Sequence, residues 1–293
     1  MPNELRVFDL PALERAIAAT QFVGHVTHLE TTPSTNDLAL QAALAGARTG
    51  VWIADQQIAG RGRGRHAWHS PAGAGIYMTA LIAPPIPMQS ALALSLRVAI
   101  AVQSAIVATT PFTRPNEIDI RWPNDLILNG KKCGGILIDT ASNPARPNQP
   151  ATLRYAVVGI GINLNHTTFP AELDPIATSL RRELPNHLEL RSEPFTRSVE
   201  NGTKCLPREP LIAAILIALD AETQSLTANL EPGTPDLAGI STWITGKRVR
   251  VEARDATPGY TGTTAGLNPS GFLLVKGDDG QLHTVLSGGL REP

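Results

Sequence analysis

"RWPNDLILNGKKCGGILID", residues 121–139, is the stretch that decides the fold. A Pro-Asn-Asp turn at 123–125 separates two short apolar segments, and a third segment begins at Lys131. Short apolar segments bounded by turn residues are typical of strands. The stretch therefore predicts strands joined by a tight turn in the middle of the chain.

The sequence on either side of this stretch extends the pattern. Further strands are predicted at 51–55, 75–83 and 155–165. Helices are predicted to flank these strands, and they cover four segments: from Asp9 to 20, from Ser34 or Thr35 to Gly46, 89–108 and 211–230. This order of elements indicates an α+β domain with a mixed sheet.

The end of the chain follows a different pattern. From Thr245 onward, short strands are separated by glycines, which predicts a small closed β-barrel. We therefore expect a catalytic domain over residues 1–240 and a β-barrel domain over residues 245–293. Polar, proline-rich segments are predicted to form loops or a linker: 141–150, 185–210 and 231–236.

The charge balance limits the classes of partner. A net charge of −1 and a pI near 6.7 argue against a protein built wholly around nucleic acid. Of the 25 basic residues, 20 are arginine, so any cationic site must be local and rich in guanidinium groups. Two cysteines are too few for a disulfide framework or a zinc cluster, which favours a reducing, cytoplasmic setting.

Neither the N-terminus nor the most apolar segment predicts a membrane protein. The first 20 residues carry charges where a signal peptide needs an apolar core. Arg97 and Gln103 lie within the apolar segment 91–109, and a bilayer penalises a central arginine by about 3 kcal/mol. We therefore expect 91–109 to be a buried helix.

"IAGRGRGRHAWHSPAGAG", residues 58–75, carries the most concentrated positive charge. Glycines next to each arginine leave backbone N–H groups free to donate, and guanidinium groups suit phosphate or carboxylate. A solvated surface loop and an RNA-binding arginine-glycine tract are the alternatives. Trp68, Ser70 and Pro71 break the repeat before a strand begins at Gly75, which favours a ligand-binding loop.

The lysine pair in the opening stretch is the second cationic feature. Lys131 and Lys132 begin a strand that continues through two glycines, and the turn before it places Asn124 and Asp125 at one end of a hairpin. A lysine that enters a buried strand is costly unless an anion meets it. The alternative is a surface lysine pair on a hairpin.

Two other motifs are open to more than one interpretation. "VVGIGINLN", 157–165, lacks the third glycine of a dinucleotide-binding loop, so Gly159 and Gly161 are expected to let a flat ligand such as adenine approach the backbone. Asn163 or Asn165 would donate to it, whereas a plain core strand is the alternative. "STN", 34–36, is consistent with a helix cap alone.

The chemistry is constrained by the motifs that the sequence lacks. There is no Ser-His-Asp order, no HExxH and no P-loop, and the seven histidines are scattered. A reaction that depends on arginine and lysine is typical of phosphoryl or nucleotidyl transfer, in which positioning and charge neutralisation supply most of the rate.

Taken in order, these motifs resemble those of the biotin protein ligases. The resemblance covers about residues 25–293 and includes "ATSL" (177–180) and the terminal "SGGLRE" (287–292). It implies the α+β, mixed-sheet catalytic domain that biotin and lipoate ligases share, followed by a small C-terminal β-barrel. It also implies an ATP-dependent biotin–[acetyl-CoA-carboxylase] ligase.

The resemblance also assigns roles to residues. Lys132 is the implied catalytic lysine, assisted by Arg61 and Arg63. The implied biotin-binding residues are Ser34, Thr35, Asn36, Gln57, Arg61, Gly62, Arg63 and Lys132. The implied ATP-binding residues are Arg63, Trp68, Asn124, Asp125 and Asn163, with Mg²⁺ near Asp125 and no metal held by the protein alone.

Partners follow from the same resemblance. The acceptor would be a lysine of a biotin carboxyl carrier protein, with a homodimer formed through the sheet and with no nucleic acid or membrane partner. His66 stands where the bacterial pattern usually has arginine, and the roughly 25 preceding residues are too few for a DNA-binding winged helix. A lipoate or octanoyl ligase of the same fold and a non-catalytic biotin-binding protein are the rival interpretations.

Overall fold

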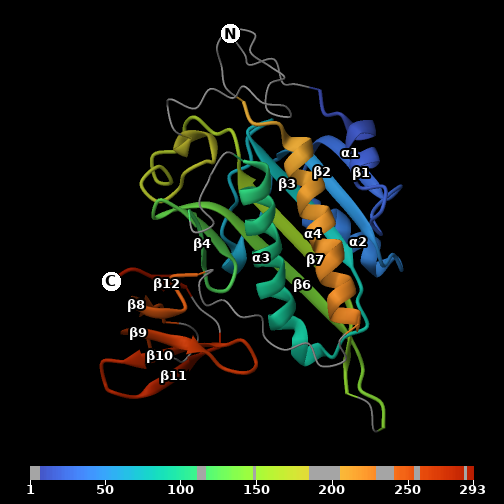
Figure 1. Cartoon of the computed structure of the whole chain (residues 1–293). Helices are drawn as coiled ribbons and strands as arrows, with labels where there is room; N and C mark the ends of the chain where they lie inside the picture. Colours follow the sequence, from blue (N-terminus) through green and yellow to red (C-terminus); the bar gives the residue numbers. More distant parts are fainter. Residues whose placement is uncertain are drawn as a thin grey trace.

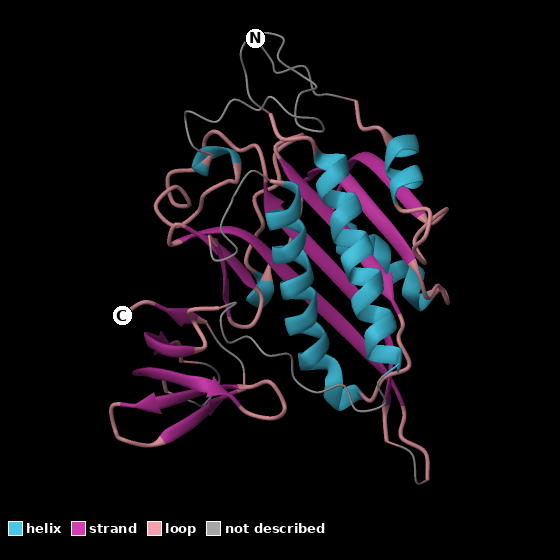
Figure 2. Ribbon diagram, viewed as in Figure 1, coloured by secondary structure: helices cyan, strands magenta, loops and turns pink. Residues whose placement is uncertain are grey.

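A computed structural model of the chain describes residues 7–110, 117–147, 150–184, 205–228, 241–253, 258–286 and 289–293. Two β-sheets organise the molecule (Figures 1 and 2). A seven-stranded sheet in the order β1-β2-β3-β7-β6-β5-β4 carries the helices, and a five-stranded sheet in the order β11-β10-β9-β8-β12 lies next to β4.

The large sheet is mixed. Only β1 and β2 pair in parallel among its strands, and the other neighbours are antiparallel. Its strands are β1 (Val26–Thr32), β2 (Gly50–Gln57), β3 (Gly75–Ile82), β4 (Ile118–Arg121), β5 (Asp125–Leu128), β6 (Lys131–Asn143) and β7 (Thr152–Asn163). The prediction of a mixed-sheet α+β unit is confirmed.

Two long helices cover one face of this sheet, α3 (Ala91–Thr109) and α4 (Arg208–Ala228) (Figure 1). Both are long and apolar enough to cross a membrane by length and composition. In this fold they pack on the sheet instead, and Leu94, Val98 and Val102 of α3 are fully buried there. The segment 91–109 is thus the buried helix that its charges predict.

Two shorter helices complete the unit, α1 (Leu10–Ala16) and α2 (Thr35–Leu44). The Asp9 carboxylate caps α1 by accepting from the Ala12 N–H at 2.8 Å. Ala39 and Ala43 of α2 pack on the opposite face of the sheet from α3 and α4. The long helices therefore leave this second face free for a site.

Two predicted loop boundaries are wrong. β6 continues to Asn143, into the segment 141–150, because its hairpin with β7 keeps antiparallel pairing beyond the core, with Asn143 opposite Thr152. α4 begins at Arg208, inside the segment 185–210. Residues 185–204 and the predicted linker 231–236 lie outside the described residues.

The C-terminal strands are β8 (Thr245–Val251), β9 (Tyr260–Leu267), β10 (Leu273–Gly277), β11 (Leu282–Val285) and β12 (Leu290–Arg291). They form an antiparallel sheet in which β11 and β12 are the edge strands. Its apolar side forms a separate core that also takes in Trp122 and Leu96 of the larger unit. The two sheets are therefore joined by shared apolar packing.

A buried histidine gives the fold a pH dependence. His166 is 2% exposed, stacks on Phe169 and lies with Nε2 3.3 Å from the Tyr77 hydroxyl. Burial, followed by the nearby His69, lowers the pKa of His166 to about 4. An unfolded chain takes up a proton near pH 6.5 and the folded chain does not, so stability falls as the pH drops from about 6.5 to 4, by about 3 kcal/mol in all.

We expect His166→Gln to flatten this acid slope. Urea unfolding at pH 7 and at pH 4.5 measures it, with the exposed His25 as control in His25→Gln. Equal slopes for the wild type and His166→Gln would contradict the expectation.

Candidate active site

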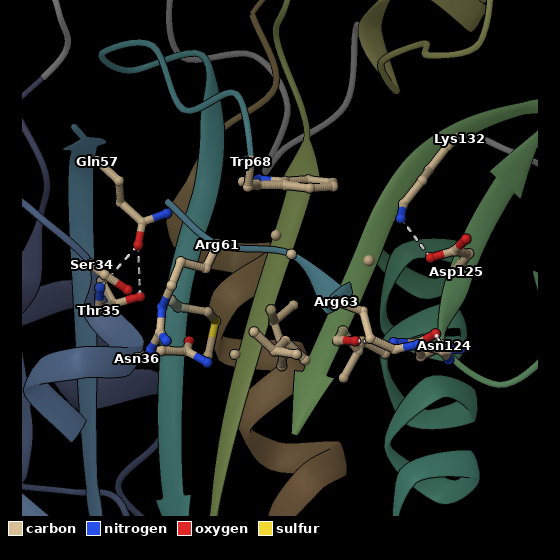
Figure 3. Close-up of a pocket in the computed structure, with 18 residues that line it drawn as sticks. Ser34, Thr35, Asn36, Gln57, Arg61, Arg63, Trp68, Asn124, Asp125 and Lys132 are labelled. Atoms are coloured by element: carbon tan, nitrogen blue, oxygen red, sulfur yellow. Dashed lines mark hydrogen bonds and ion pairs between the residues drawn. The ribbon is translucent and has the colours of Figure 1, made fainter. Parts of the chain in front are cut away.

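A pocket opens on the α2 side of the large sheet, between the C-terminal end of β2 and the β5–β6 hairpin (Figure 3). It is lined by Ser34, Thr35, Asn36, Gln57, Arg61, Gly62, Arg63, Trp68, Met78, Asn124, Asp125, Lys132, Gly135, Ile136, Leu137, Gly159, Ile160 and Gly161. Every residue that the resemblance assigns to biotin, and every one that it assigns to ATP except Asn163, lies in this lining.

The floor of the pocket follows from strand register. Tyr77, Gly161, Gly135, Asp125 and Arg121 stand opposite one another on β3, β7, β6, β5 and β4, and so form one row across five strands. Since directly opposed residues share a face, the two glycines leave a trough between the bulky Tyr77 and the charged Asp125.

The trough contains the Trp68 indole. A Cβ at Gly161 would lie 2.5 Å from Trp68 Cε2, and one at Gly135 would lie 3.5 Å from Trp68 Cζ3. The interpretation that Gly161 faces a free flat ligand is therefore corrected: the flat group against it is Trp68. The buried indole N–H has no hydrogen-bond partner among the described residues, whereas most buried donors in folded proteins have one.

Gly159 faces the side chain of Asn36. A Cβ at Gly159 would lie 2.1 Å from Asn36 Oδ1. Asn36 Oδ1 accepts from the Thr79 hydroxyl at 2.6 Å, whereas its buried Nδ2 has no partner among the described residues. An unsatisfied amide that lines a pocket is suited to a ligand's acceptor oxygen.

Gln57 makes hydrogen bonds both to the start of α2 and to the arginine-rich stretch 58–75, here called the arginine loop. Its Oε1 accepts from the Thr35 N–H at 2.9 Å and from the Thr35 hydroxyl at 3.1 Å (Figure 3). Its Nε2 donates to Ser70 Oγ at 3.1 Å. Ser34 is the N-cap residue of α2, but its side chain makes no capping hydrogen bond. "STN" therefore begins the helix and also lines the pocket.

Lys132 lies at the other end of the trough. Its Nζ is 2.5 Å from Asp125 Oδ1 and 5.5 Å from the centre of the Trp68 ring (Figure 3). Lys131 instead donates to the Asp174 carbonyl at 3.1 Å. The structure thus separates the two lysines: Lys132 lines the pocket and Lys131 does not.

A β-bulge explains why Lys132 faces the trough. Leu126 pairs with Gly134 but Ile127 pairs with Lys132, so Cys133 is an extra residue in β6. Simple alternation would place Lys132 and Gly135 on opposite faces, and the bulge turns the lysine to the face of Gly135. A Cβ at Gly135 would be 3.2 Å from Lys132 Nζ, which confirms the shared face.

A nearby segment of the same polypeptide, residues 176–178, holds Lys132 in this orientation. The Lys132 N–H donates to the Ile176 carbonyl, and the Thr178 N–H donates to the Lys132 carbonyl. Residues 176–178, which overlap the motif 177–180, therefore hold the backbone of the lysine. Cys133 is fully buried, and burial raises its pKa to about 12, so its thiol is protonated near neutral pH.

Asp125 is shared by two cations. Arg121 donates to Oδ2 through Nε at 3.2 Å and Nη2 at 2.6 Å, and Lys132 takes Oδ1. Burial raises the pKa of Asp125, but the charges and hydrogen bonds of Lys132 and Arg121 outweigh burial and hold that pKa below its ordinary value. Arg121 carries no signal in the sequence that marks it as a site residue, because its contact with Asp125 depends on the hairpin register.

The arginine loop folds over the pocket. The Gly62 N–H donates to the His66 carbonyl at 2.7 Å and the Trp68 N–H donates to the Gly60 carbonyl at 2.9 Å. Gly64 has φ +68°, in the left-handed region that favours glycine. These turns bring the loop back so that Trp68 reaches the trough.

The two described loop arginines have polar partners. Arg61 pairs with Asp37 of α2, a site residue that the motifs do not predict although it follows "STN" directly. Arg63 Nη1 lies 3.5 Å from Asn124 Oδ1. The two guanidinium groups therefore lie at opposite ends of the pocket.

Asn163 lies outside the pocket. It is 5% exposed at the end of β7, and its Nδ2 donates to the Thr178 carbonyl at 3.0 Å. Asn165 donates to the Leu206 carbonyl at 2.9 Å. Both amides thus bind neighbouring backbone. No group of three or more His, Cys, Asp or Glu side chains among the described residues is arranged to hold a metal ion.

Comparisons with known proteins agree with this geometry. A sequence model of the biotin/lipoate A/B protein ligase family matches residues 29–163, and one of the biotin protein ligase C-terminal domain matches residues 244–288. A bifunctional ligase/repressor BirA of Bacillus spizizenii is 31% identical over 265 residues, which cover 89% of this chain and 72% of that protein. The biotin–[acetyl-CoA-carboxylase] ligase of Mycobacterium tuberculosis is 38% identical over 152 residues, about half of each chain.

Solved structures show the same fold. A biotin protein ligase from Aquifex aeolicus, in complex with biotin and ATP, superposes with a TM-score of 0.67 at 22% identity. The match covers 92% of this chain and all of that one. Since the family models fall on both units of the fold and the Bacillus relative spans most of the chain, this chain belongs to the biotin protein ligase family.

Proposed function

We propose that this protein joins biotin to ATP as biotinyl-5′-AMP and then transfers biotin to a specific lysine of a biotin carboxyl carrier protein. One observation carries the proposal. A single pocket with glycines in its floor has an unpaired amide at one end and a cationic group at the other. Asn36 Nδ2 lies at the first end and Lys132 at the second, and Arg61 and Arg63 lie over them. The relatives named as biotin–[acetyl-CoA-carboxylase] ligases support the same acceptor class.

In the first half-reaction, a carboxylate oxygen of biotin attacks the α-phosphorus of ATP and pyrophosphate leaves. We place the ring system of biotin against Ser34, Thr35, Asn36 and Gln57, and its carboxylate toward Lys132. Two anions must approach each other for this bond to form, so the ammonium group of Lys132 and the guanidinium group of Arg63 neutralise charge where it gathers. Trp68 offers an aromatic face to the adenine base.

In the second half-reaction, the acceptor's lysine amine attacks the acyl carbon of the adenylate, and AMP leaves. Water would compete for the same carbon, so the loop must cover the adenylate until the acceptor arrives. Arg61 would exchange its contact with Asp37 for the anionic ligand. Because both groups of that pair are over 40% exposed, little free energy opposes the exchange.

Magnesium would enter with the nucleotide as its triphosphate complex. The Asp125 carboxylate, assigned by resemblance to the nucleotide and magnesium, already has Lys132 on one oxygen and Arg121 on the other. We therefore propose that the triphosphate oxygens supply most of the ligands of the metal, as hard cations prefer.

We also propose that the protein acts in the cytoplasm, where the free thiols of Cys133 and Cys205 would persist. A homodimer would form at β1, because the other edge strand of the large sheet, β4, lies against the C-terminal unit.

Incubation of the protein with biotin, ATP, magnesium and a biotin carrier domain tests the proposal. We expect biotin on a single carrier lysine, with one AMP and one pyrophosphate formed per biotin transferred. Label from lipoate or octanoate alone would identify the rival ligase, and biotin binding without consumption of ATP would identify a sensor. Either result would overturn the proposed function.

A further inference from the structure

The C-terminal sheet is attached to the strand next to the catalytic hairpin. Ser241 Oγ donates to the Ile120 carbonyl at 2.5 Å, and the indole N–H of Trp122 donates to the Gly271 carbonyl at 3.1 Å. The Trp122 ring is part of the apolar core of the C-terminal sheet. β4 is therefore bound on one side by β5 and on the other by the C-terminal unit.

Arg121 lies between these two attachments. Its guanidinium carbon is 5.5 Å from the centre of the Trp243 ring, and its Nη2 is 2.6 Å from Asp125 Oδ2. Trp243 is 4% exposed and belongs to the core of the C-terminal sheet. Lys132 holds the other oxygen of the same carboxylate. Trp243, Arg121, Asp125 and Lys132 thus form an unbroken series of contacts from the C-terminal core to the pocket.

We propose that Arg121, held against Trp243 of the C-terminal unit, is a positioning residue that controls how firmly Asp125 holds the catalytic Lys132. The inference rests on the proposed function, since Lys132 must exchange a contact with Asp125 for contacts with the reacting anions. The C-terminal unit acts on the reaction through Arg121.

Arg121 affects Lys132 because the two cations compete for the carboxylate of Asp125. With Arg121 in place, the negative charge of Asp125 is divided between two cations, and the carboxylate remains paired when Lys132 turns to the substrate. Without Arg121, Asp125 would attract Lys132 alone, and release of the lysine would leave a partly buried, unpaired carboxylate. Trp243 keeps the guanidinium group in place through its aromatic face.

Steady-state adenylation of the full chain tests the proposal. We expect Arg121→Gln to lower kcat by roughly tenfold to a hundredfold, with KM for biotin unchanged, because a misplaced catalytic group acts on the chemical step. Arg121→Lys should restore part of this loss. Trp243→Leu should also lower kcat, and Trp243→Phe, which keeps an aromatic face, should lower it less.

The double variant Arg121→Gln/Trp243→Leu tests whether the two residues act in series. We expect it to be no slower than Arg121→Gln, whereas multiplied losses would overturn the proposal. Arg97→Gln is the matched control, because Arg97 is similarly buried and pairs with Glu222 at 3.0 Å between α3 and α4. An equal loss of kcat in Arg97→Gln, or wild-type kcat in Arg121→Gln, would also overturn the proposal.

The reactivity of the Lys132 amine can be measured without turnover, so it tests the role of Arg121 independently of the proposed function. Acetylation of lysines in the folded protein, followed by mass spectrometry, reports how often Lys132 leaves Asp125. We expect slower labelling of Lys132 in Arg121→Gln than in the wild type, with the exposed Lys276 as internal reference. Equal or faster labelling would overturn the positioning role even if the protein ligates no biotin.

Discussion

Lys132→Met should fold as the wild type does and lose at least tenfold in the rate of adenylate formation. A charge-assisted contact contributes about 1.5–3 kcal/mol, and each 1.36 kcal/mol is a factor of ten in rate. Asp125 keeps Arg121 on its second oxygen, so the substitution leaves no unpaired carboxylate. Biotin-dependent exchange of pyrophosphate into ATP measures the first half-reaction by itself.

The adjacent lysine supplies the control. Lys131 donates to the Asp174 carbonyl and does not line the pocket, so Lys131→Met should keep the exchange rate within about twofold, well below one 1.36 kcal/mol step. The two variants remove the same charge from neighbouring positions of one strand. Wild-type exchange in Lys132→Met, or equal losses in both variants, would refute the assignment of the catalytic lysine.

Much of the fold could be predicted because its signals are local. Pro123-Asn-Asp marks the turn between β4 and β5, and Asp9 before an apolar periodic segment marks the start of α1. The segment 91–109 is apolar along its length with one arginine and one glutamine, and it forms the buried helix α3. These features depend on a few consecutive residues, and such features can be recognised without a structure.

The contacts of the site could be predicted less well because they depend on register. Arg121 meets Asp125 only once the hairpin pairs them, and the bulge at Cys133 decides which lysine faces the trough. The resemblance assigns Asn163 to ATP, yet its amide donates to the Thr178 carbonyl. The spacing of Lys132 from the glycines identifies it by resemblance as the catalytic lysine, and the bulge explains physically why it faces the trough.

Substitution of two glycines of β7, Gly159 and Gly161, should disturb the two ends of the pocket separately. Gly159 and Gly161 face the same side of β7, two residues apart, and neither has a φ in the left-handed region. An alanine at either position therefore leaves the backbone unstrained and acts through its added methyl group. That group would meet Asn36 at Gly159 and Trp68 at Gly161.

Gly159→Ala should raise KM for biotin by about tenfold or more, because Asn36 must leave its bond with Thr79 and turn its amide away from the ligand. Gly161→Ala should instead raise KM for ATP, because the methyl group pushes Trp68 out of the trough. Steady-state KM values for both substrates measure the split. Asn36→Ala combined with Gly159→Ala should be no worse than Asn36→Ala alone, since the clash is then gone. If both glycine variants raised the same KM, or if the combined variant lost further affinity for biotin, the division of the pocket into a biotin end and a nucleotide end would be wrong.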